Sequence, residues 1–398
     1  MRLNPVLAGL GTYPFVRLDE AKREAAARGI ELIDFGMGEP REETPRFIRE
    51  AFAEAVEPLS TYPKAEGLPE LRAAIAEWVG RRYGVALDPD RHVVPTLGSK
   101  EAVFHLAQVA GGDAVAVPSP GYPVPERGAR FAGREIVELP LDPARGHLPD
   151  LAALDPALLD RLAILWLNYP NNPTGATIPL EELRRAAELA RRHGFLLACD
   201  EAYSELWFEG DAPASGLQVG DLTNVVVLNT LSKRSSMPGY RSGFVAGDPE
   251  AIAALKRYRP NVGVAPQEVV QRAAIVAWGD EEHVAEVRER YRAKRDVLRP
   301  ALLAAGFEDA GGPATFFLWM RTPRGEGDEA CALRLLEHGI VCAPGSFFGS
   351  GGAGHVRFAL VPPVEACERA AEILAGAAAQ APPGAAPLGA PSSRAARR

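Results

Sequence analysis

Residues 225–246 read VVVLNTLSKRSSMPGYRSGFVA, and this stretch carries a polar loop between two short apolar runs. Similar apolar runs recur along the chain, and segments with helical spacing separate them. This alternation is typical of an α/β domain with a largely parallel sheet that is buried on both faces. The expected strands lie at 114–117, 163–167, 195–199, 225–228 and 243–246.

Two of the segments between these strands predict helices, at 100–109 and 180–193. In the second, acidic residues begin the segment and basic residues end it, as the helix dipole favours. We therefore expect one large domain over residues 46–280, with a central sheet flanked by helices.

The rest of the chain predicts a smaller α+β domain that is built from both chain ends. Residues 281–375 should supply its connecting helix and most of its elements, and residues 1–45 should pack with them. Residues 376–398 are dominated by Ala, Pro, Gly and Ser, a composition that buries too little apolar surface to become ordered, so we expect a disordered tail. The elements expected in this domain are a helix at 280–305, strands at 315–320 and 356–360, and a helix at 329–338.

The composition excludes several classes of protein. The chain has 398 residues, with 44 basic and 52 acidic side chains, and its net charge of -8 argues against a dedicated nucleic-acid binder. No apolar stretch approaches the roughly 20 residues that cross a bilayer, and the amino terminus does not resemble a secretion signal, so we expect a cytoplasmic protein. The cysteines and histidines lack metal-ligand spacing, and we expect no metal.

The loop in the opening stretch contains Lys233. A lysine amine is nucleophilic only when it is deprotonated, and desolvation or nearby cations lower its pKa enough for a Schiff base with an aldehyde cofactor. The hydroxyls of Thr230 and Ser232, together with Arg241, could bind a phosphate. Taken alone, however, a lysine in such a loop is usually only solvated.

Another strand ends at the sequence Cys-Asp-Glu-Ala-Tyr, which contains Asp200 and Tyr203. An aspartate at the carboxyl end of a strand in an α/β sheet points into the crevice where ligands bind. There it could keep a pyridine nitrogen protonated, and Tyr203 could reach the phenolic oxygen of the same ring. The alternative for this pair is a helix N-cap and a packing tyrosine.

Two more loops carry candidate residues, and the first of them follows a strand at the same predicted edge. The first, residues 168–175, is rich in turn formers and includes Asn172, which could donate to the phenolic oxygen from the opposite side. The second opens a helix at Ser99 and Lys100, where free backbone N–H groups suit a phosphate.

An aromatic and an arginine complete the candidate site. Tyr122 follows a strand and could stack on a planar ring, although a packing role is the default for a single tyrosine. Arg357 lies in the predicted small domain, where its planar guanidinium could bind a substrate carboxylate or form an interdomain salt bridge.

Together, these motifs resemble the pyridoxal-phosphate-dependent aminotransferases of class I/II, the aspartate aminotransferase fold. The similarity runs from about residue 32 to residue 374, and the motifs occur in the order of the family. The resemblance implies an α/β protein with the type I fold of pyridoxal 5'-phosphate (PLP) enzymes, in which a large PLP-binding domain is joined to a smaller domain. It also implies a homodimer with shared active sites.

The resemblance gives each motif residue a role. Lys233 forms the Schiff base with PLP, Asp200 pairs with the ring nitrogen, and Tyr203 binds the phenolic oxygen. The other expected residues are Asn172 at the phenolic oxygen and the substrate, Tyr122 on the ring, Ser99, Lys100, Thr230, Ser232 and Arg241 around the phosphate, Gly38, Lys100 and Arg357 at the substrate, and Tyr62 reaching the phosphate of the neighbouring subunit.

The implied reaction is a ping-pong transamination in which Lys233 moves a proton from the substrate and 2-oxoglutarate is the expected acceptor. Residues 232–248, 265–278, 282–284 and 344–348 look like the bacterial succinyldiaminopimelate aminotransferases of lysine biosynthesis, apart from Ser-Met at 236–237. We therefore expect N-succinyl-L,L-2,6-diaminopimelate as the donor. Lys100 resembles a lysine that binds a distal carboxylate in acidic-substrate members, and Arg41 is a second candidate.

Other functions stay open at this point. Within the family, the substrate could be aspartate, alanine or L,L-diaminopimelate. Decarboxylation, aldol cleavage and β-elimination also stay open, because the cofactor residues determine the electron sink and not which bond breaks. A PLP-binding regulator without turnover is disfavoured, because we find no helix-turn-helix segment before residue 32 and the net charge is negative.

Overall fold

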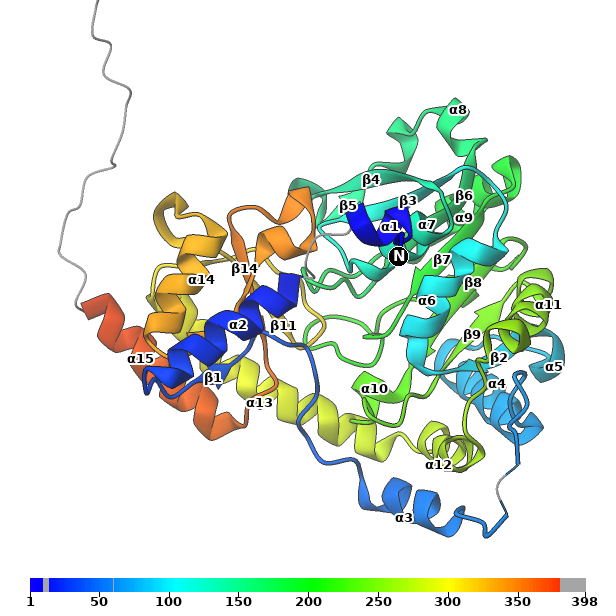
Figure 1. Ribbon diagram of the computed structural model, residues 1–398, viewed down its shortest axis with the longest axis horizontal. Coiled ribbons are helices and arrows are strands. Elements are labelled where there is room, and N and C mark those ends of the chain that lie inside the picture. Colours follow the sequence, from blue (N-terminus) through cyan, green and yellow to red (C-terminus); the bar gives the residue numbers. More distant parts are fainter. Residues whose placement is uncertain (10–13, 60, 380–398) are drawn as a thin grey trace, which may run out of the picture.

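The computed structural model describes residues 1–9, 14–59 and 61–379, and the chain folds into two domains that lie side by side (Figure 1). The large domain contains an eight-stranded sheet, and the small domain contains a four-stranded sheet. Each domain has its own buried core, with Trp78 and Trp278 in the large domain and Phe316 and Phe358 in the small one.

The central sheet of the large domain contains β2 (Val93–Thr96), β3 (Ala114–Ser119), β4 (Glu135–Asp142), β5 (Leu148–Pro149), β6 (Leu162–Asn168), β7 (Leu196–Asp200), β8 (Val225–Thr230) and β9 (Gly243–Gly247). Their spatial order is β2-β9-β8-β7-β6-β3-β4-β5. The pairs from β8 through β4 are parallel, which confirms the mostly parallel sheet. The carboxyl ends of β6, β7 and β8 therefore lie at one edge.

Sequence patterns alone did not predict three of these strands, β2, β4 and β5. β4 has several exposed or half-buried positions, and β2 is short and contains Pro95, so neither forms a continuous apolar run. β9 was expected, but it pairs antiparallel with both β8 and β2. The connection from β8 to β9 contains only one helical turn, whereas a parallel return needs a longer crossover.

Helices cover the large sheet, and α9 shows why they form. It spans Leu180–His193, as predicted, and buries Leu183, Ala186, Ala187 and Ala190 on one face. It ends at Gly194, whose φ of 78° is the left-handed conformation common at helix ends. The others are α3 (Arg46–Glu54), α4 (Pro69–Tyr83), α5 (Pro89–His92), α6 (Gly98–Val109), α7 (Val124–Phe131), α8 (Pro156–Leu159), α10 (Leu231–Arg234), α11 (Pro249–Tyr258) and α12 (Glu268–Gly279), with single 3-10 turns at Pro143–Arg145, Leu151–Ala153, Gly216–Val219 and Arg259–Val262.

The small domain contains a sheet with the order β10-β11-β14-β13 and several helices. The expected strand at 315–320 begins later, because Thr315 has a φ of 67° that is incompatible with an extended strand. The elements of the small domain are β10 (Glu308–Asp309), β11 (Phe317–Arg321), β13 (Ala343–Pro344), β14 (His355–Ala359), α13 (Glu282–Ala304), α14 (Asp328–Glu337), α15 (Val364–Ala379) and 3-10 turns at Pro323–Gly325, Gly345–Phe348 and Ser350–Gly352.

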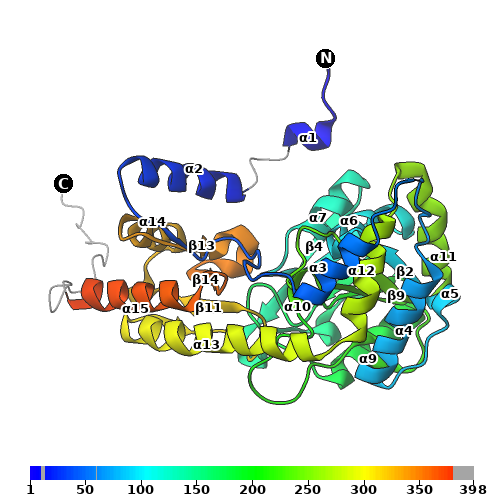
Figure 2. The same cartoon turned by 90° about the horizontal axis from the view of Figure 1, so that it is seen from below.

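The amino-terminal segment joins this domain. β1 (Ile33–Asp34) pairs in parallel with β12 (Ile340–Val341), and α2 (Pro14–Ala27) packs against α14. Figure 2 shows α2 over α14, with α1 (Pro5–Gly9) projecting away from the body. The carboxyl-terminal helix continues to Ala379, past the expected start of the tail at residue 376, and residues 380–398 lie outside the described residues.

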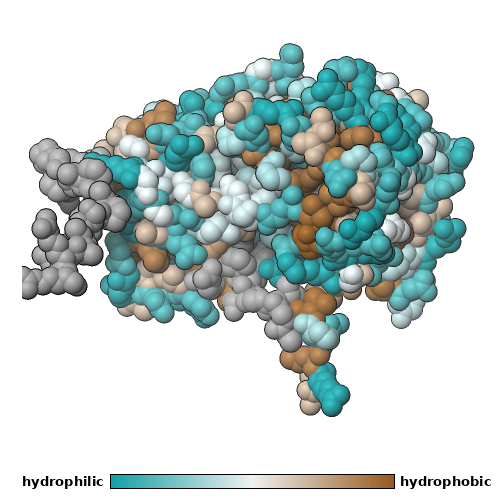
Figure 3. Space-filling view, turned by 90° about the horizontal axis from the view of Figure 1, so that it is seen from above, coloured by the Kyte–Doolittle hydropathy of each residue, from teal (hydrophilic) through white to brown (hydrophobic). Residues whose placement is uncertain are grey.

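Figure 3 shows one face of the molecule, which is mostly hydrophilic apart from a hydrophobic band over the large domain and the projecting amino-terminal segment. Across the described ranges, we find no helix that combines the length and the apolar character needed to span a bilayer. The four cysteines are buried as free thiols.

Candidate active site

A cavity of about 590 Å³ lies between the two domains at the carboxyl ends of β6, β7 and β8. Loops after these strands, the start of α6 and residues of the small domain line it together. All but two of the predicted site residues meet here: Gly38, Ser99, Lys100, Tyr122, Asn172, Asp200, Tyr203, Thr230, Ser232, Lys233, Arg241 and Arg357. The exceptions are Tyr62, which is fully exposed, and Arg41, which lines a neighbouring hollow.

Lys233 lies in the single turn of α10, directly after β8. Its Nζ donates a hydrogen bond to the Gly38 carbonyl oxygen at 2.6 Å. Burial lowers the pKa of Lys233 to about 7, and the positive charges of Arg357 and Arg241 act in the same direction. Near neutral pH, a large fraction of this amine is therefore unprotonated and able to act as a nucleophile or base.

Asp200 is the last residue of β7 and is buried. Burial raises the pKa of its carboxyl to about 6, while a hydrogen bond from the Ala202 N–H (3.2 Å) and the charge of Lys233 oppose this effect. The bond to Ala202 is a local turn contact, close to the alternative that the sequence left open. Asp200 makes this contact and also lines the cavity, where a positively charged group of a bound ligand would favour the ionised carboxylate.

Tyr203 and Asn172 lie on the same wall as Asp200. The Tyr203 ring makes edge contacts with Phe316 and Phe317, at centroid distances of 5.5 and 5.3 Å, and burial raises the pKa of its hydroxyl. The Asn172 Oδ1 accepts a bond from Arg357 Nη1 at 2.8 Å. Because a guanidinium can only donate, this contact fixes the orientation of the amide, and its NH₂ group is the end that can donate elsewhere.

The predicted phosphate-binding groups converge around Arg241. Its Nη2 donates to the Leu97 carbonyl at 3.2 Å, at the start of α6, and the Thr230 and Ser232 hydroxyls are 2.9 Å apart. Gly98 has a φ of 68°, and a Cβ there would approach Arg241 Nη2 to 2.5 Å. A side chain at Gly98 would therefore displace this arginine.

Arg357 lies on β14, is buried, and links the two domains through hydrogen bonds. Nη1 contacts Asn172, and Nη2 donates to the Gly36 carbonyl at 2.8 Å. Its guanidinium carbon lies 4.2 Å from the Phe317 ring centroid and 4.6 Å from that of Phe348. An arriving carboxylate would meet a guanidinium whose orientation is already fixed.

Several residues that line the cavity were not predicted from the sequence, and four of them matter for its chemistry or shape. Asn168 accepts a bond from the Asn172 N–H (2.9 Å) and donates to the Asp200 carbonyl (3.0 Å), so it joins two site loops. Phe317 and Phe348 form apolar wall, and Glu39 adds an exposed carboxylate. The sequence signals were weak: Asn168 ends a strand beside the predicted loop, and Glu39 follows Gly38. Nothing in the sequence around the two phenylalanines distinguishes a side chain that lines a cavity from one that packs in a core.

Comparison with known proteins decides the family, because the sequence model for aminotransferase class I and II matches residues 30–374. The chain belongs to this family. This aminotransferase is similar to the L,L-diaminopimelate aminotransferase of Dehalococcoides mccartyi, with 36% identity covering 96% of this chain and all of that protein. It is 38% identical to the protein of the same name from Aquifex aeolicus, over 91% of this chain and 96% of that one.

Solved structures agree with this assignment. An aminotransferase from Neisseria meningitidis is 36% identical, with a TM-score of 0.87 over 94% of this chain and all of that one. A probable N-succinyldiaminopimelate aminotransferase from Thermus thermophilus is also 36% identical, with a TM-score of 0.85 over 91% and 99% of the two chains. The protein is therefore a PLP-dependent aminotransferase with the aspartate aminotransferase fold.

The residues around the cavity fit PLP. Asp200 would supply a buried carboxylate for a protonated ring nitrogen, and Lys233 would supply an amine with a lowered pKa. The donors that would hold a phosphate are the guanidinium of Arg241, the hydroxyls of Thr230 and Ser232, and the start of the α6 helix, where Gly98 leaves room for Arg241. Asn172 and Tyr203 would supply the donors for a phenolic oxygen.

Proposed function

We propose that this aminotransferase takes its amino group from a diaminopimelate in the N-succinylated form and passes it to 2-oxoglutarate. The observation that carries the proposal is that two cations, Arg357 and Lys100, line the same cavity as Lys233. Both proposed substrates have at least two carboxylates, which such a pair of cations would bind. The similarity of residues 232–248 to succinyldiaminopimelate aminotransferases supports the succinylated form, as does the Thermus structural relative.

In the proposed mechanism, the residues of the chain bind, orient and deprotonate the substrate. Arg357 holds the α-carboxylate, and Gly38 lines the same cavity. Bound PLP supplies the electron sink for the α-carbon. Lys233 Nζ removes the α-proton, for which a pKa near 7 is well matched. Asp200 maintains a negative charge at the position of the ring nitrogen, and Tyr203 and Asn172 donate to the phenolic oxygen.

Lys100 is the proposed partner of the distal carboxylate. It lines the cavity at the start of α6, whereas Arg41, the second candidate, lines an adjoining hollow and lies 3.5 Å from Asp34 in an ion pair. The structure thus favours Lys100 over Arg41 for this role.

Free L,L-diaminopimelate is the second candidate donor. Its distal end carries an ammonium group, and Glu39 offers an exposed carboxylate on the cavity wall. The names of the Dehalococcoides and Aquifex relatives support the same substrate. Either donor would place the enzyme in diaminopimelate and lysine biosynthesis.

A donor panel separates these candidates. The purified holoenzyme is supplied with 2-oxoglutarate and one donor at a time: N-succinyl-L,L-diaminopimelate, L,L-diaminopimelate, aspartate or alanine. Glutamate formation gives kcat/KM for each. We expect the succinylated donor to be the best substrate. A negligible rate with that donor and a high rate with the free diamine would overturn the succinyl assignment and leave the aminotransferase assignment intact.

We also propose that the enzyme is a homodimer in which Tyr62 reaches the phosphate of the neighbouring subunit. Tyr62 is fully exposed, near the exposed apolar side chains Val56 and Leu59 in the chain. A hollow of about 760 Å³ adjoins the site and shares Arg241 with it. Light scattering should give a dimer mass, and Tyr62→Phe should weaken PLP binding. A monomer with full activity would contradict both statements.

A further inference from the structure

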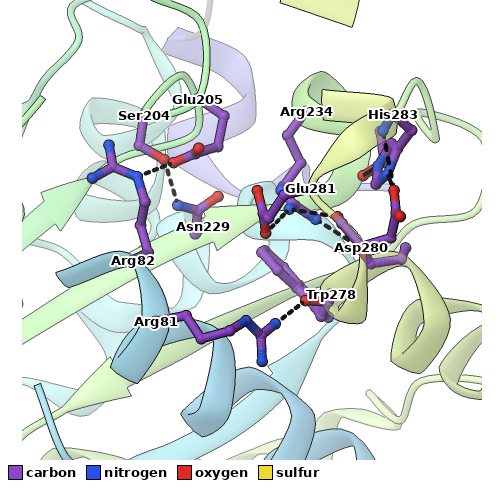
Figure 4. Close-up of polar contacts among 12 residues, drawn as sticks. Arg81, Arg82, Ser204, Glu205, Asn229, Arg234, Trp278, Asp280, Glu281 and His283 are labelled. Carbon is purple, nitrogen blue, oxygen red and sulfur yellow. Dashed lines mark hydrogen bonds and ion pairs between the residues drawn. The ribbon is translucent and has the colours of Figure 1, made fainter. Parts of the chain in front are cut away.

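The two residues that follow Lys233 contact the junction between the domains, and Figure 4 shows Arg234 beside Trp278 and Glu281 there. Arg234 is buried, and its Nη1 donates to the Ala277 carbonyl at 2.8 Å. Its Nη2 lies 2.7 Å from Glu281 Oε1, and its guanidinium carbon is 4.7 Å from the Trp278 ring centroid. Arg234 is thereby fixed to the end of α12 and to the residues just before α13.

Ser235 makes the second contact, through a chain of hydrogen bonds. Its Oγ lies 2.8 Å from His283 Nε2, and His283 Nδ1 lies 2.5 Å from Asp280 Oδ1. Because a carboxylate only accepts, Nδ1 carries the proton, and Nε2 of the neutral ring accepts from the serine hydroxyl. Burial lowers the pKa of His283, which favours this neutral form, although Asp280 opposes the shift.

These three residues have the order of a nucleophile, base and acid, but Ser235 is completely buried and a substrate cannot reach its hydroxyl. The hydroxyl instead holds the backbone at the end of α10. The Ser235 N–H donates to the Leu231 carbonyl at 3.1 Å and closes the one turn that carries Lys233. A single turn has little stability of its own, so contacts outside it must fix its position.

Asp280 and Glu281 are the residues between α12, in the large domain, and α13, the long helix of the small domain. The turn that carries Lys233 is therefore bonded to the segment that connects the two domains. The contact between Ser235 and His283 bridges 48 residues of sequence.

We propose that Ser235, His283 and Asp280 are positioning residues that hold the α10 turn, and thus Lys233 Nζ, at the distance needed for proton transfer. This inference rests on the proposed role of Lys233 as the proton-transfer group. A displacement of about 1 Å at a reacting group can lower a rate by roughly 100-fold. Loss of the contact should therefore lower kcat more than it changes substrate or cofactor affinity.

The test uses the full-length holoenzyme and compares Ser235→Ala and His283→Phe with His193→Phe. The control is matched, because His193 Nδ1 contacts Asp160 Oδ1 at 2.7 Å, at the end of α9. We call the hydrogen-bonded residues Ser235, His283 and Asp280 the relay, and Ser235→Ala and His283→Phe the relay variants. We expect kcat to fall by about 10- to 100-fold in these two variants, with KM and the PLP dissociation constant within about threefold of wild type. His193→Phe should keep the wild-type kcat.

Two further measurements distinguish positioning from general destabilisation. Hydrogen exchange of the 231–236 amides in the cofactor-free protein should speed up in both relay variants and stay unchanged in the control. The double variant Ser235→Ala/His283→Phe should lose no more kcat than either single variant, because the relay is already broken. His283→Gln keeps an acceptor for Ser235 and should recover most of the activity.

The inference is overturned if both relay variants keep kcat within twofold of wild type, or if the loss appears in KM or PLP affinity instead. Unchanged exchange of the 231–236 amides would also overturn it. The proposed function is tested separately, by Lys233→Ala. Normal turnover in that variant would show that Lys233 does not transfer the proton, whatever the relay variants show.

Discussion

Glu201, the neighbour of Asp200, gives the sharpest prediction of how this site affects stability. The Glu201 side chain is buried, and its Oε1 accepts a bond from the Gly216 N–H at 2.7 Å. Burial raises the pKa of this carboxyl from 4.5 to about 8, and the charge of Asp200 adds to the shift. The perturbation is Glu201→Gln, which keeps an acceptor for Gly216 and stays neutral at every pH.

The sign of the effect follows from the two pKa values. Between pH 4.5 and 8, the folded protein keeps the Glu201 proton while the unfolded chain has released it. The folded state therefore binds more protons, and this carboxyl makes the free energy of unfolding fall as pH rises through that window. Each pH unit in this window lowers the free energy of unfolding by about 1.4 kcal/mol. The raised pKa of Glu201 therefore destabilises the folded protein by about 1 kcal/mol at pH 5 and about 3 kcal/mol at pH 7.

The assay is urea unfolding of wild type and Glu201→Gln in the same cofactor state, at several pH values from 5 to 8. The difference between the two proteins isolates Glu201, because the other titrating groups are common to both. The variant should be more stable, and its advantage should grow by about 3 kcal/mol between pH 5 and pH 8. A variant that is less stable at pH 8, or a difference that does not change with pH, would refute the reasoning.

Three further predictions concern the active site. Lys233→Ala should abolish transamination and keep the circular dichroism of the folded protein; normal turnover would remove its catalytic role. Arg357→Lys loses the planar fork that contacts Asn172 and Gly36, and we expect kcat/KM for the amino donor to fall about 100-fold, the equivalent of about 3 kcal/mol; an unchanged value would place the carboxylate elsewhere. Gly98→Ala puts a Cβ against Arg241 at a left-handed φ, so PLP affinity in a spectroscopic titration should fall by about 10-fold or more; tight binding would show that Arg241 does not hold the phosphate.

Local sequence signals were sufficient where one element contains the whole pattern. The apolar face and the charged ends of α9 fixed its bounds, and the strands that end at Asp200 and Thr230 were visible as apolar runs. The carboxyl ends of parallel strands meet at one edge, so their polar residues could be expected to share a site.

Other features depend on contacts between distant residues, which no local pattern encodes. Whether Phe317 and Phe348 line a cavity or a core is decided by the position of one domain against the other. The contact between Ser235 and His283 spans 48 residues, and the residues between them show no repeat that would predict it. The expected role of Tyr62 needs a second subunit, so it stays a prediction.

The central claim is that the amine of Lys233 carries the cofactor in the cavity where Asp200 is buried. Borohydride treatment of the PLP-loaded enzyme fixes the cofactor irreversibly to the amine that carries it, and mass spectrometry of the proteolytic peptides locates that amine. The peptide that contains Lys233 should carry the label, with none on Lys100, the other lysine that lines the cavity among the described residues. A label on Lys100, or on any lysine other than Lys233, would contradict the account.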